Sequence, residues 1–466
     1  MKKIVLLLFF FSFFCLSFSL NIYPILNQLS MKPGEEQTVT IRLSATRYSE
    51  RVKIECKDFA IVSGSYVYDL PDYPYSLKPF LEIPYDEIEL SAGQVVDLPV
   101  RIRIPRGFTE AQAFGSIFFS VSGGMEGGVT YLLNLVSVFI VDVENPKKMD
   151  MSISDARFFD LMAGDCPKEL KETYGDFGTI VKLKVKNTGN MVLAVTGEMR
   201  LVSRELGRIV TTIPLDRTRF VVFPALEEEF TFFTDVLVPS GRLSVQIEGV
   251  SQNIRVAGVL ETTGPERKVL EKAVRIEPVF KLFEADRTLN EKFQIHNLTP
   301  DKLQLSLSVK EPFDITPKNL TLAPYASSSL FVRYDPRKAN LPPGDSVFRI
   351  VPLSDGEVRT LGTGVIVLRK GLLEPSYTFK ILEYSQEDRK VALEVENTGK
   401  MTMEFSIVEK EPYRTTTLVE SVIVFPGEKK TLRFFHNLPL ELAKNAVLLR
   451  SRIYATQEWK EEVLPW

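Results

Sequence analysis

Short runs of alternating apolar and polar residues recur from one end of the chain to the other, and this pattern constrains the fold more than any other feature. Residues 181–187 read VKLKVKN and residues 391–397 read VALEVEN, and Thr-Gly-x-Met follows each run. Alternation with a period of two places every second side chain on the same face of a strand, whereas helical spacing is scarce. The sequence therefore predicts an all-β protein.

The alternating runs form a repeat of about 100 residues. Asparagines end three of the runs, at positions 187, 297 and 397, and a second landmark, a proline after an apolar run, follows in step at 224, 324 and 426. This period matches one immunoglobulin-like β-sandwich and is too long for a solenoid repeat. Because Asn and Gly tolerate a positive φ, we expect the Asn-Thr-Gly steps to turn the chain tightly through that conformation.

The N-terminal region carries the same pattern with a longer spacing, so the repeat predicts four tandem immunoglobulin-like sandwiches. Short segments that combine charge with Gly or Pro mark the junctions, and short linkers favour a rod with restricted joints. The expected divisions are a signal peptide over 1–19 and sandwiches over 20–145, 146–264, 265–371 and 372–466.

The first 19 residues predict export. Two lysines precede an apolar run, and Ser17-Phe18-Ser19 provides small residues for cleavage, which is typical of a secretory signal peptide; retention as an anchor is the alternative. After cleavage 55 basic residues face 60 acidic ones, so no basic field favours nucleic acid, and we expect a mature chain that spans no membrane. Cys56 is expected as a buried thiol and Cys166 as a loop residue; a bridge between them stays open.

The sequence contains little of the chemistry that catalysis or metal binding needs. It has two histidines, and neither sits in a metal-binding or nucleophile motif. His296 falls on the outward phase of its strand, and His436 has no Cys or second His near it in the sequence. We therefore expect no catalytic residue, no cofactor and no metal. A hydrolase built on paired carboxylates, such as Asp58, Asp86 or Asp97, is the alternative.

An insertion over residues 61–84 in the first sandwich carries the best candidate contact surface. It is rich in Tyr, Pro and Asp, and exposed aromatic rings bury a large area at small entropic cost when a partner binds. The predicted partner contacts are Tyr66, Tyr68, Tyr73 and Tyr75. The alternative interpretation is that these rings cover the open end of the sandwich.

The first sandwich resembles extracytoplasmic modules of the periplasmic pilus-chaperone type and the domain that interacts with WxL-type surface proteins. The resemblance rests on strand-and-turn patterns over residues 29–41, 80–93, 100–105 and 113–121. It implies an immunoglobulin-like fold and binding through an exposed sheet edge. The number of domains differs from the two of pilus chaperones.

Together these features predict a non-enzymatic scaffold, binding or chaperone-like protein of the bacterial cell envelope, periplasmic or extracellular. Its partner would be an envelope or surface protein, held through sheet edges and the loops of the first sandwich. The alternative is a carbohydrate-binding or adhesive surface protein, which would need exposed aromatic rings, such as Tyr73 and Tyr75, on a concave face.

Overall fold

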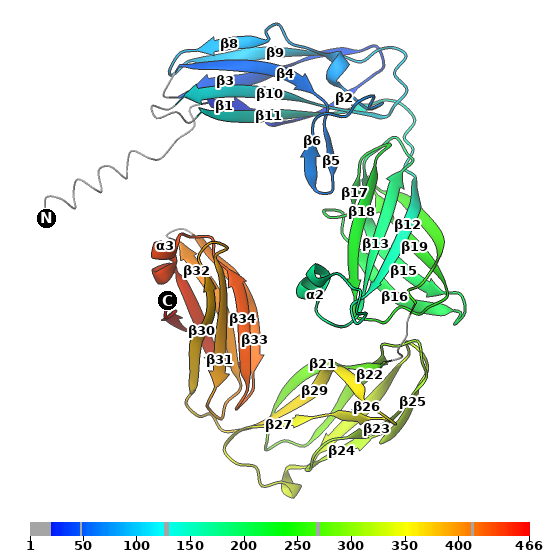
Figure 1. The fold of residues 1–466 in the computed structure, drawn as a ribbon, viewed down its shortest axis with the longest axis vertical. Coiled ribbons are helices and arrows are strands. Elements are labelled where there is room, and N and C mark those ends of the chain that lie inside the picture. Colours follow the sequence, from blue (N-terminus) through cyan, green and yellow to red (C-terminus); the bar gives the residue numbers. More distant parts are fainter. Residues whose placement is uncertain (1–19, 47–48, 125–129, 267–270, 412–413) are drawn as a thin grey trace, which may run out of the picture. The chain divides into compact units, whose positions relative to one another are not determined.

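The structure of the chain is a computed structural model, which describes residues 20–466 except 47–48, 125–129, 267–270 and 412–413. The predicted signal peptide over 1–19 lies outside the described residues. Two compact units make up the chain, Met1–Arg267 and Lys268–Trp466, and each contains two β-sandwiches (Figure 1). The all-β prediction of tandem immunoglobulin-like sandwiches is confirmed.

The first sandwich packs a four-stranded sheet, ordered β1-β3-β9-β7, against a five-stranded sheet, ordered β2-β11-β10-β4-β8. The predicted insertion forms the hairpin β5–β6, which projects from the two sheets (Figure 1). The strands are β1 (Leu20–Tyr23), β2 (Leu26–Met31), β3 (Glu36–Ala45), β4 (Glu50–Lys57), β5 (Ala60–Val62), β6 (Ser65–Val67), β7 (Leu81–Glu82), β8 (Glu87–Leu90), β9 (Val95–Arg103), β10 (Gln112–Gly124) and β11 (Thr130–Val143).

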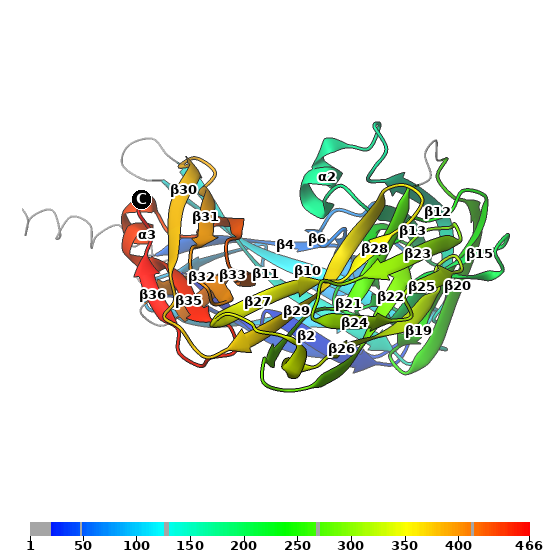
Figure 2. The same ribbon diagram turned by 90° about the horizontal axis from the view of Figure 1, so that it is seen from below.

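The second sandwich packs sheet β12-β13-β18 and the short pair β14-β17 against sheet β16-β15-β19-β20. One short helix, α2 (Lys168–Tyr174), projects from these sheets in both ribbon views (Figure 1, Figure 2). The strands are β12 (Met151–Asp160), β13 (Thr179–Asn187), β14 (Leu193–Ala194), β15 (Thr196–Ser203), β16 (Arg208–Leu215), β17 (Val221–Val222), β18 (Glu227–Thr234), β19 (Arg242–Ser251) and β20 (Ile254–Thr263).

The third sandwich packs the six-stranded sheet β24-β26-β22-β21-β29-β27 against the three-stranded sheet β25-β23-β28. Its strands are β21 (Lys272–Glu284), β22 (Leu289–Asn297), β23 (Leu303–Ser308), β24 (Phe313–Thr316), β25 (Asn319–Leu322), β26 (Ser327–Tyr334), β27 (Gly344–Arg349), β28 (Val351–Leu353) and β29 (Val358–Lys370).

The fourth sandwich packs sheet β30-β31-β34 against sheet β33-β32-β35-β36, with helix α3 (Leu440–Ala446) at its edge. The strands are β30 (Tyr377–Ser385), β31 (Lys390–Asn397), β32 (Met403–Glu411), β33 (Arg414–Val424), β34 (Lys429–Phe435), β35 (Val447–Ile453) and β36 (Lys460–Val463). Within the described residues no helix is long and apolar enough to cross a membrane.

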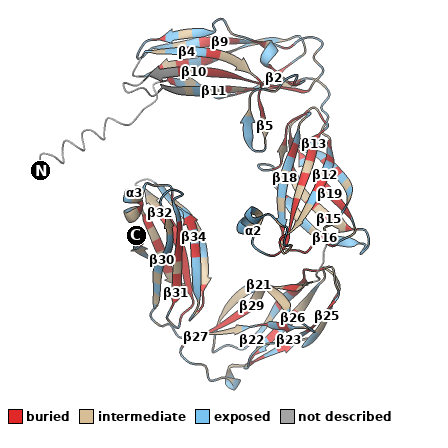
Figure 3. Cartoon of the chain, viewed as in Figure 1, coloured by how far each residue is buried: buried red, intermediate tan, exposed pale blue. Residues whose placement is uncertain are grey.

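The alternation read from the sequence fixes which side chains enter the cores. Along β23, Leu303, Leu305 and Leu307 are buried while the residues between them are exposed. Figure 3 shows the same alternation of buried and exposed residues along strands of every sandwich. Because the period of a strand is two, this pattern also fixes the register of pairing, since a one-residue slip would expose the whole core face.

The repeated asparagines hold their turns by buried hydrogen bonds. The Asn397 amide donates to the carbonyls of Met401 (2.7 Å) and Val424 (2.9 Å), and its oxygen accepts from the Gly399 N–H (3.1 Å). Asn187 makes the same three contacts, and Asn297 makes equivalent ones. In each repeat the Asn side chain thus links its own turn to the end of the strand before the proline. This link explains why the asparagine and the proline recur together in each repeat.

The expected positive φ of the Asn-Thr-Gly steps is wrong, because the left-handed residues lie in the other landmark. Ala225, Tyr325 and Gly427, each directly after the proline, have φ values of 61°, 53° and 76°. Pro followed by a positive φ is typical of a type II turn. Gly189 is needed for space instead: a Cβ there would lie 2.4 Å from the Lys148 carbonyl oxygen.

Candidate binding site at the open edge of the first sandwich

Strand β11 has a half-open edge, which makes it the best candidate site for a partner. It pairs with β10 from Thr130 to Asp142, whereas β2 pairs with its other side only from Val138 to Val143. The cause is local: the chain crosses from one sheet to the other at Pro24, so β1 pairs with β3 in the opposite sheet. The segment Thr130–Ser137 therefore has a strand on one side only, within the described part of the chain.

The hydrogen bonds at the end of β2 show which backbone groups face the open side. The Val138 N–H donates to the Ile25 carbonyl (2.8 Å), and the Asn27 amide donates to the Val138 carbonyl (3.2 Å). In an antiparallel strand the direction of the backbone groups alternates from residue to residue. The N–H and C=O groups of Val136 and Asn134 therefore point to the same side, where no strand of the described residues pairs with them.

Both polar and apolar side chains lie around this open edge. Asn134 is exposed and accepts a hydrogen bond from Ser120 Oγ (2.7 Å), while Leu135 packs against the core. Where β2 begins, Tyr23, Ile25 and Leu26 are 74%, 65% and 50% exposed. Large apolar side chains beside unpaired backbone groups suit an extended segment that pairs by its main chain and buries alternate side chains.

The four tyrosines predicted as partner contacts do not form one exposed surface. Tyr73 and Tyr75 are each 7% exposed and belong to a buried cluster with Phe59, Ala60, Phe114 and Phe223. Burial raises the pKa of both phenols. Their predicted exposure is wrong because both rings pack in this cluster, which also includes Phe223 of the second sandwich.

The other two tyrosines lie nearer to solvent. Tyr66 is 65% exposed, with its ring centroid 5.9 Å from that of Phe59, and Tyr68 is partly buried, edge-on to Phe118 at 4.6 Å. A role of Tyr66 and Tyr68 in binding a partner stays a prediction.

The insertion connects the first sandwich to the second through polar contacts as well. Tyr75 Oη donates to the Gly189 carbonyl (3.2 Å), and the Val192 N–H donates to the Gln112 side chain (2.8 Å). At the tip of the β5–β6 hairpin, the Ser63 N–H donates to Glu228 Oε2 (2.7 Å). The Asn turn and the Phe-Pro turn of the second sandwich thus both contact the first.

The same end of the fourth sandwich contacts the third. Phe425 packs with Val365 and Val367, and its ring lies 5.4 Å from that of Phe280. Arg369 and Asp345 form a buried bidentate ion pair with two distances of 2.8 Å, and Asp345 also accepts from the Thr402 N–H (2.7 Å). A buried pair with further hydrogen bonds fixes orientation more than it adds stability.

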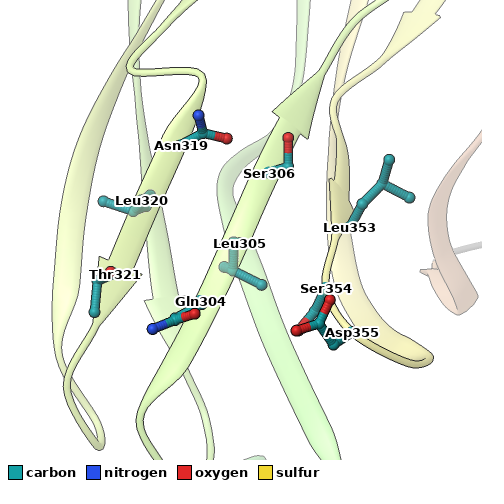
Figure 4. A pocket seen from close by; sticks show the side chains of 9 residues that line it. All are labelled: Gln304, Leu305, Ser306, Asn319, Leu320, Thr321, Leu353, Ser354 and Asp355. Atoms are coloured by element: carbon teal, nitrogen blue, oxygen red, sulfur yellow. The ribbon is translucent and has the colours of Figure 1, made fainter.

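A shallow depression of about 470 Å³ lies on the outer face of sheet β25-β23-β28 (Figure 4). Amide and hydroxyl side chains face each other across the strands there, Gln304 opposite Thr321 and Ser306 opposite Asn319. Ser354 and Asp355 close one side (Figure 4). Pro352 lacks an N–H, so the β28 edge is poorly suited to strand addition, and the depression suits a small polar ligand better.

Two of the residues considered for catalysis, His436 and Asp58, have structural partners. His436 is buried, with Nδ1 2.7 Å from the Leu438 carbonyl oxygen, and stacks on Tyr384. Asp58 accepts from the Leu70 N–H (3.2 Å) and Ser76 Oγ (2.5 Å), so it organises the insertion, a role the sequence did not indicate. No group of three potential metal ligands occurs among the described residues. Cys56 and Cys166 are both free thiols.

No protein-family model matches the chain, and no curated protein matches its sequence. Among solved structures, it is similar to the class 5 fimbriae chaperone CfaA (13% identity, 53% of this chain and 100% of that chain, TM-score 0.28). It is also similar to the Pseudomonas aeruginosa chaperone CupB2 (16%, 41% and 100%, 0.24) and the E. coli chaperone DraB (13%, 53% and 98%, 0.24). The similarity to pilus chaperones thus extends over about half the chain at low identity.

Proposed function

We propose that this protein is an exported, chaperone-like binding protein of the bacterial cell envelope, which holds an extended segment of an envelope or surface protein along the open edge of β11. The activity proposed for this edge is binding. The N-terminal segment, typical of a signal peptide, supports export, and the resemblance of the first sandwich to WxL-interacting and pilus-chaperone modules supports a protein partner.

One observation carries the proposal. The backbone groups of Asn134 and Val136 face away from β10, and β2 begins to pair with β11 only at Val138. A partner strand in this place would continue the position of β2 along β11 and would complete the five-stranded sheet. Main-chain hydrogen bonds would supply affinity, and the apolar side chains Tyr23, Ile25 and Leu26 would lie beside the bound segment.

Asn134→Pro tests this proposal with Asn134→Ala as its matched control. Proline removes the outward N–H, whereas alanine removes the same side chain and keeps that N–H. The outward N–H makes no bond to β10, so the proline variant should keep the hairpin. A photocrosslinker at Val136 would report the partner in cells, and one at Glu89 in β8, the opposite edge of the same sheet, would serve as the positional control.

The proposal predicts one crosslinked envelope protein from position 136, absent from position 89. That product should persist in the Asn134→Ala background and disappear in Asn134→Pro, with the circular dichroism and melting temperature of all variants matching. Equal crosslinking in the two backgrounds, or equal crosslinking at both edges, would overturn binding by strand addition.

Carbohydrate binding is the second candidate function, and the depression of Figure 4 is the observation that favours it. Its neutral amides and hydroxyls can exchange hydrogen bonds with sugar hydroxyls, and Leu353, which is 54% exposed, offers an apolar contact. Its volume lies in the range of about 300–1,000 Å³ usual for small-ligand sites. Affinity electrophoresis in soluble glucan, xylan and chitin oligomers, compared with Gln304→Ala, tests it; identical mobility in all three would exclude it.

A further inference from the structure

Three side chains on adjacent strands of the third sandwich lie in a line on the outer face of the six-stranded sheet, joined by one hydrogen bond and one ion-pair contact. Ser327 Oγ of β26 lies 2.6 Å from His296 Nδ1 of β22. On the other side of the imidazole, His296 Nε2 lies 3.5 Å from Glu277 Oε2 of β21. The order is therefore hydroxyl, imidazole, carboxylate, with the hydroxyl residue exposed and the imidazole 20% exposed.

Strand pairing places these residues together. His296 lies directly opposite Ser327 on one side and Arg275 on the other, and Glu277 is two residues from Arg275 on the same face. Arg275 Nε lies 2.9 Å from Glu277 Oε1, so the guanidinium holds one carboxylate oxygen while the other faces the imidazole. The negative charge of this nearby carboxylate favours the imidazole tautomer with its proton on Nε2, and in that tautomer Nδ1 accepts the serine proton.

We propose that Ser327 is an activated nucleophile that accepts an acyl group from an activated ester, with His296 as its general base and Glu277 as the residue that positions His296. Ser327 Oγ would attack the ester carbonyl carbon while its proton passes to His296 Nδ1. The tetrahedral intermediate would then collapse, the carbon–oxygen bond to the alcohol would break, and His296 would return the proton to the departing alkoxide. The products are O-acyl-Ser327 and the free alcohol.

The surface next to this line has the groups that such a reaction needs. A depression of about 580 Å³ begins at Glu277 and is lined by Pro278, Val279, Lys292 and Gln294. Gln294 and Lys292 precede His296 on the outward phase of β22, so an amide and an ammonium border this depression, and in the proposed reaction they would stabilise negative charge on the substrate. Val279 is 52% exposed and offers an apolar contact for the acyl chain.

This inference is independent of the proposed binding function, which uses the first sandwich. The sequence alone does not indicate this nucleophile, because Ser327, His296 and Glu277 lie on three different strands and come together only through strand pairing. The alternation in the sequence places His296 on the outward phase of β22, but no sequence pattern points to Ser327 or Glu277.

A fluorophosphonate probe tests the proposal on the full chain, because it phosphonylates activated serines with loss of fluoride. The probe should label the native protein at Ser327, located by peptide mass spectrometry, and p-nitrophenyl acetate should release a burst of one equivalent of p-nitrophenol. Ser327→Ala should abolish both signals. His296→Asn should slow labelling by ~100-fold, the usual contribution of a general base. Glu277→Gln should slow it by a smaller factor.

Ser329→Ala is the matched control, since Ser329 lies two residues further on the same face of β26, opposite Gln294 rather than a histidine. It should leave labelling unchanged. Three outcomes would each overturn the proposal. The first is labelling of Ser327→Ala at the wild-type rate, and the second is a label located on Ser329. The third is that the native protein is labelled no faster than the urea-unfolded protein. Melting temperatures of the variants separate these outcomes from loss of folding.

Discussion

The buried asparagine of each repeat should contribute several times more free energy to the stability of its turn than a surface residue does. Asn397→Ala measures this contribution. The side chain is fully buried and makes three hydrogen bonds, so its removal deletes the bonds to the Gly399 N–H and to the carbonyls of Met401 and Val424. At about 1 kcal/mol for each bond, and more for a group left buried and unpaired, the loss is about 3 kcal/mol. That figure corresponds to a ~100-fold increase in the opening equilibrium of the turn.

Hydrogen exchange on the full chain is the appropriate assay, because a four-domain protein does not unfold in two states. Two amides report the turn: Asn397 N–H donates to the Glu428 carbonyl, and Gly427 N–H donates to the Asn397 carbonyl. Both should exchange ~100-fold faster in Asn397→Ala. The Ala225 N–H, which donates to the equivalent Asn187 carbonyl in the second sandwich, should be unchanged and serves as the internal control.

Asn187→Ala should reverse this result: the Ala225 amide of the second sandwich should exchange faster, and the exchange rates of the Asn397 and Gly427 amides in the fourth should not change. Asn397→Asp adds a test of charge, because it replaces the donating amide with an oxygen that faces two carbonyl oxygens. Its destabilisation should exceed that of alanine at pH 7 and shrink in acid, where a buried carboxyl takes up a proton. A change below threefold at both reporting amides would refute the assignment of the repeated Asn as the element that fixes the turns.

Two further predictions concern titratable groups. Burial raises the pKa of Glu228, and the hydrogen bonds from Ser63 offset this only in part. The folded protein therefore binds the proton more tightly than the unfolded chain. The stability that this carboxyl gives to the contact between the two sandwiches should be full below the ordinary value of 4.5 and should be lost as pH rises through the raised pKa. Protection of the Ser63 amide should therefore decrease with pH in the native protein and stay constant in Glu228→Gln, and a flat profile in both would contradict this. Burial also raises the pKa of the Cys56 thiol to about 11, so at pH 8 iodoacetamide should alkylate Cys166 well before Cys56. Peptide mass spectrometry checks the order, urea should remove the difference, and equal rates in the folded protein would show that Cys56 is accessible.

The fold could be predicted from the sequence because its two signals are local. Alternation in β13, β23 and β31 fixes the buried face of each strand, and the proline landmarks mark a tight turn wherever they occur. The positions of the asparagines were also predicted, but their role was not. A preference for positive φ belongs to one residue, whereas the hydrogen bond from Asn187 to Val222 depends on a strand end 35 residues away.

The site was less predictable because it depends on contacts between distant segments. Tyr73 and Tyr75 lie in a polar, aromatic stretch that is typical of an exposed loop, and their burial depends on a cluster formed with Phe114 and with Phe223 of the second sandwich. The open edge of β11 is likewise set elsewhere, by the point at which β2 starts to pair. Composition shows that aromatic residues are present, but register and packing decide which of them a partner can reach.

The residue before each repeat proline bears on how this protein can be cut into fragments. Phe223 and Phe425 hold that position in the second and fourth sandwiches and are buried against the preceding sandwich, whereas the third has Ala323. A fragment that begins at residue 146 or 372 would expose a phenylalanine ring to water and should aggregate readily. A fragment that begins at 265 presents only a methyl group at this turn. The two halves 20–264 and 265–466 are therefore the pieces to express for crystallisation.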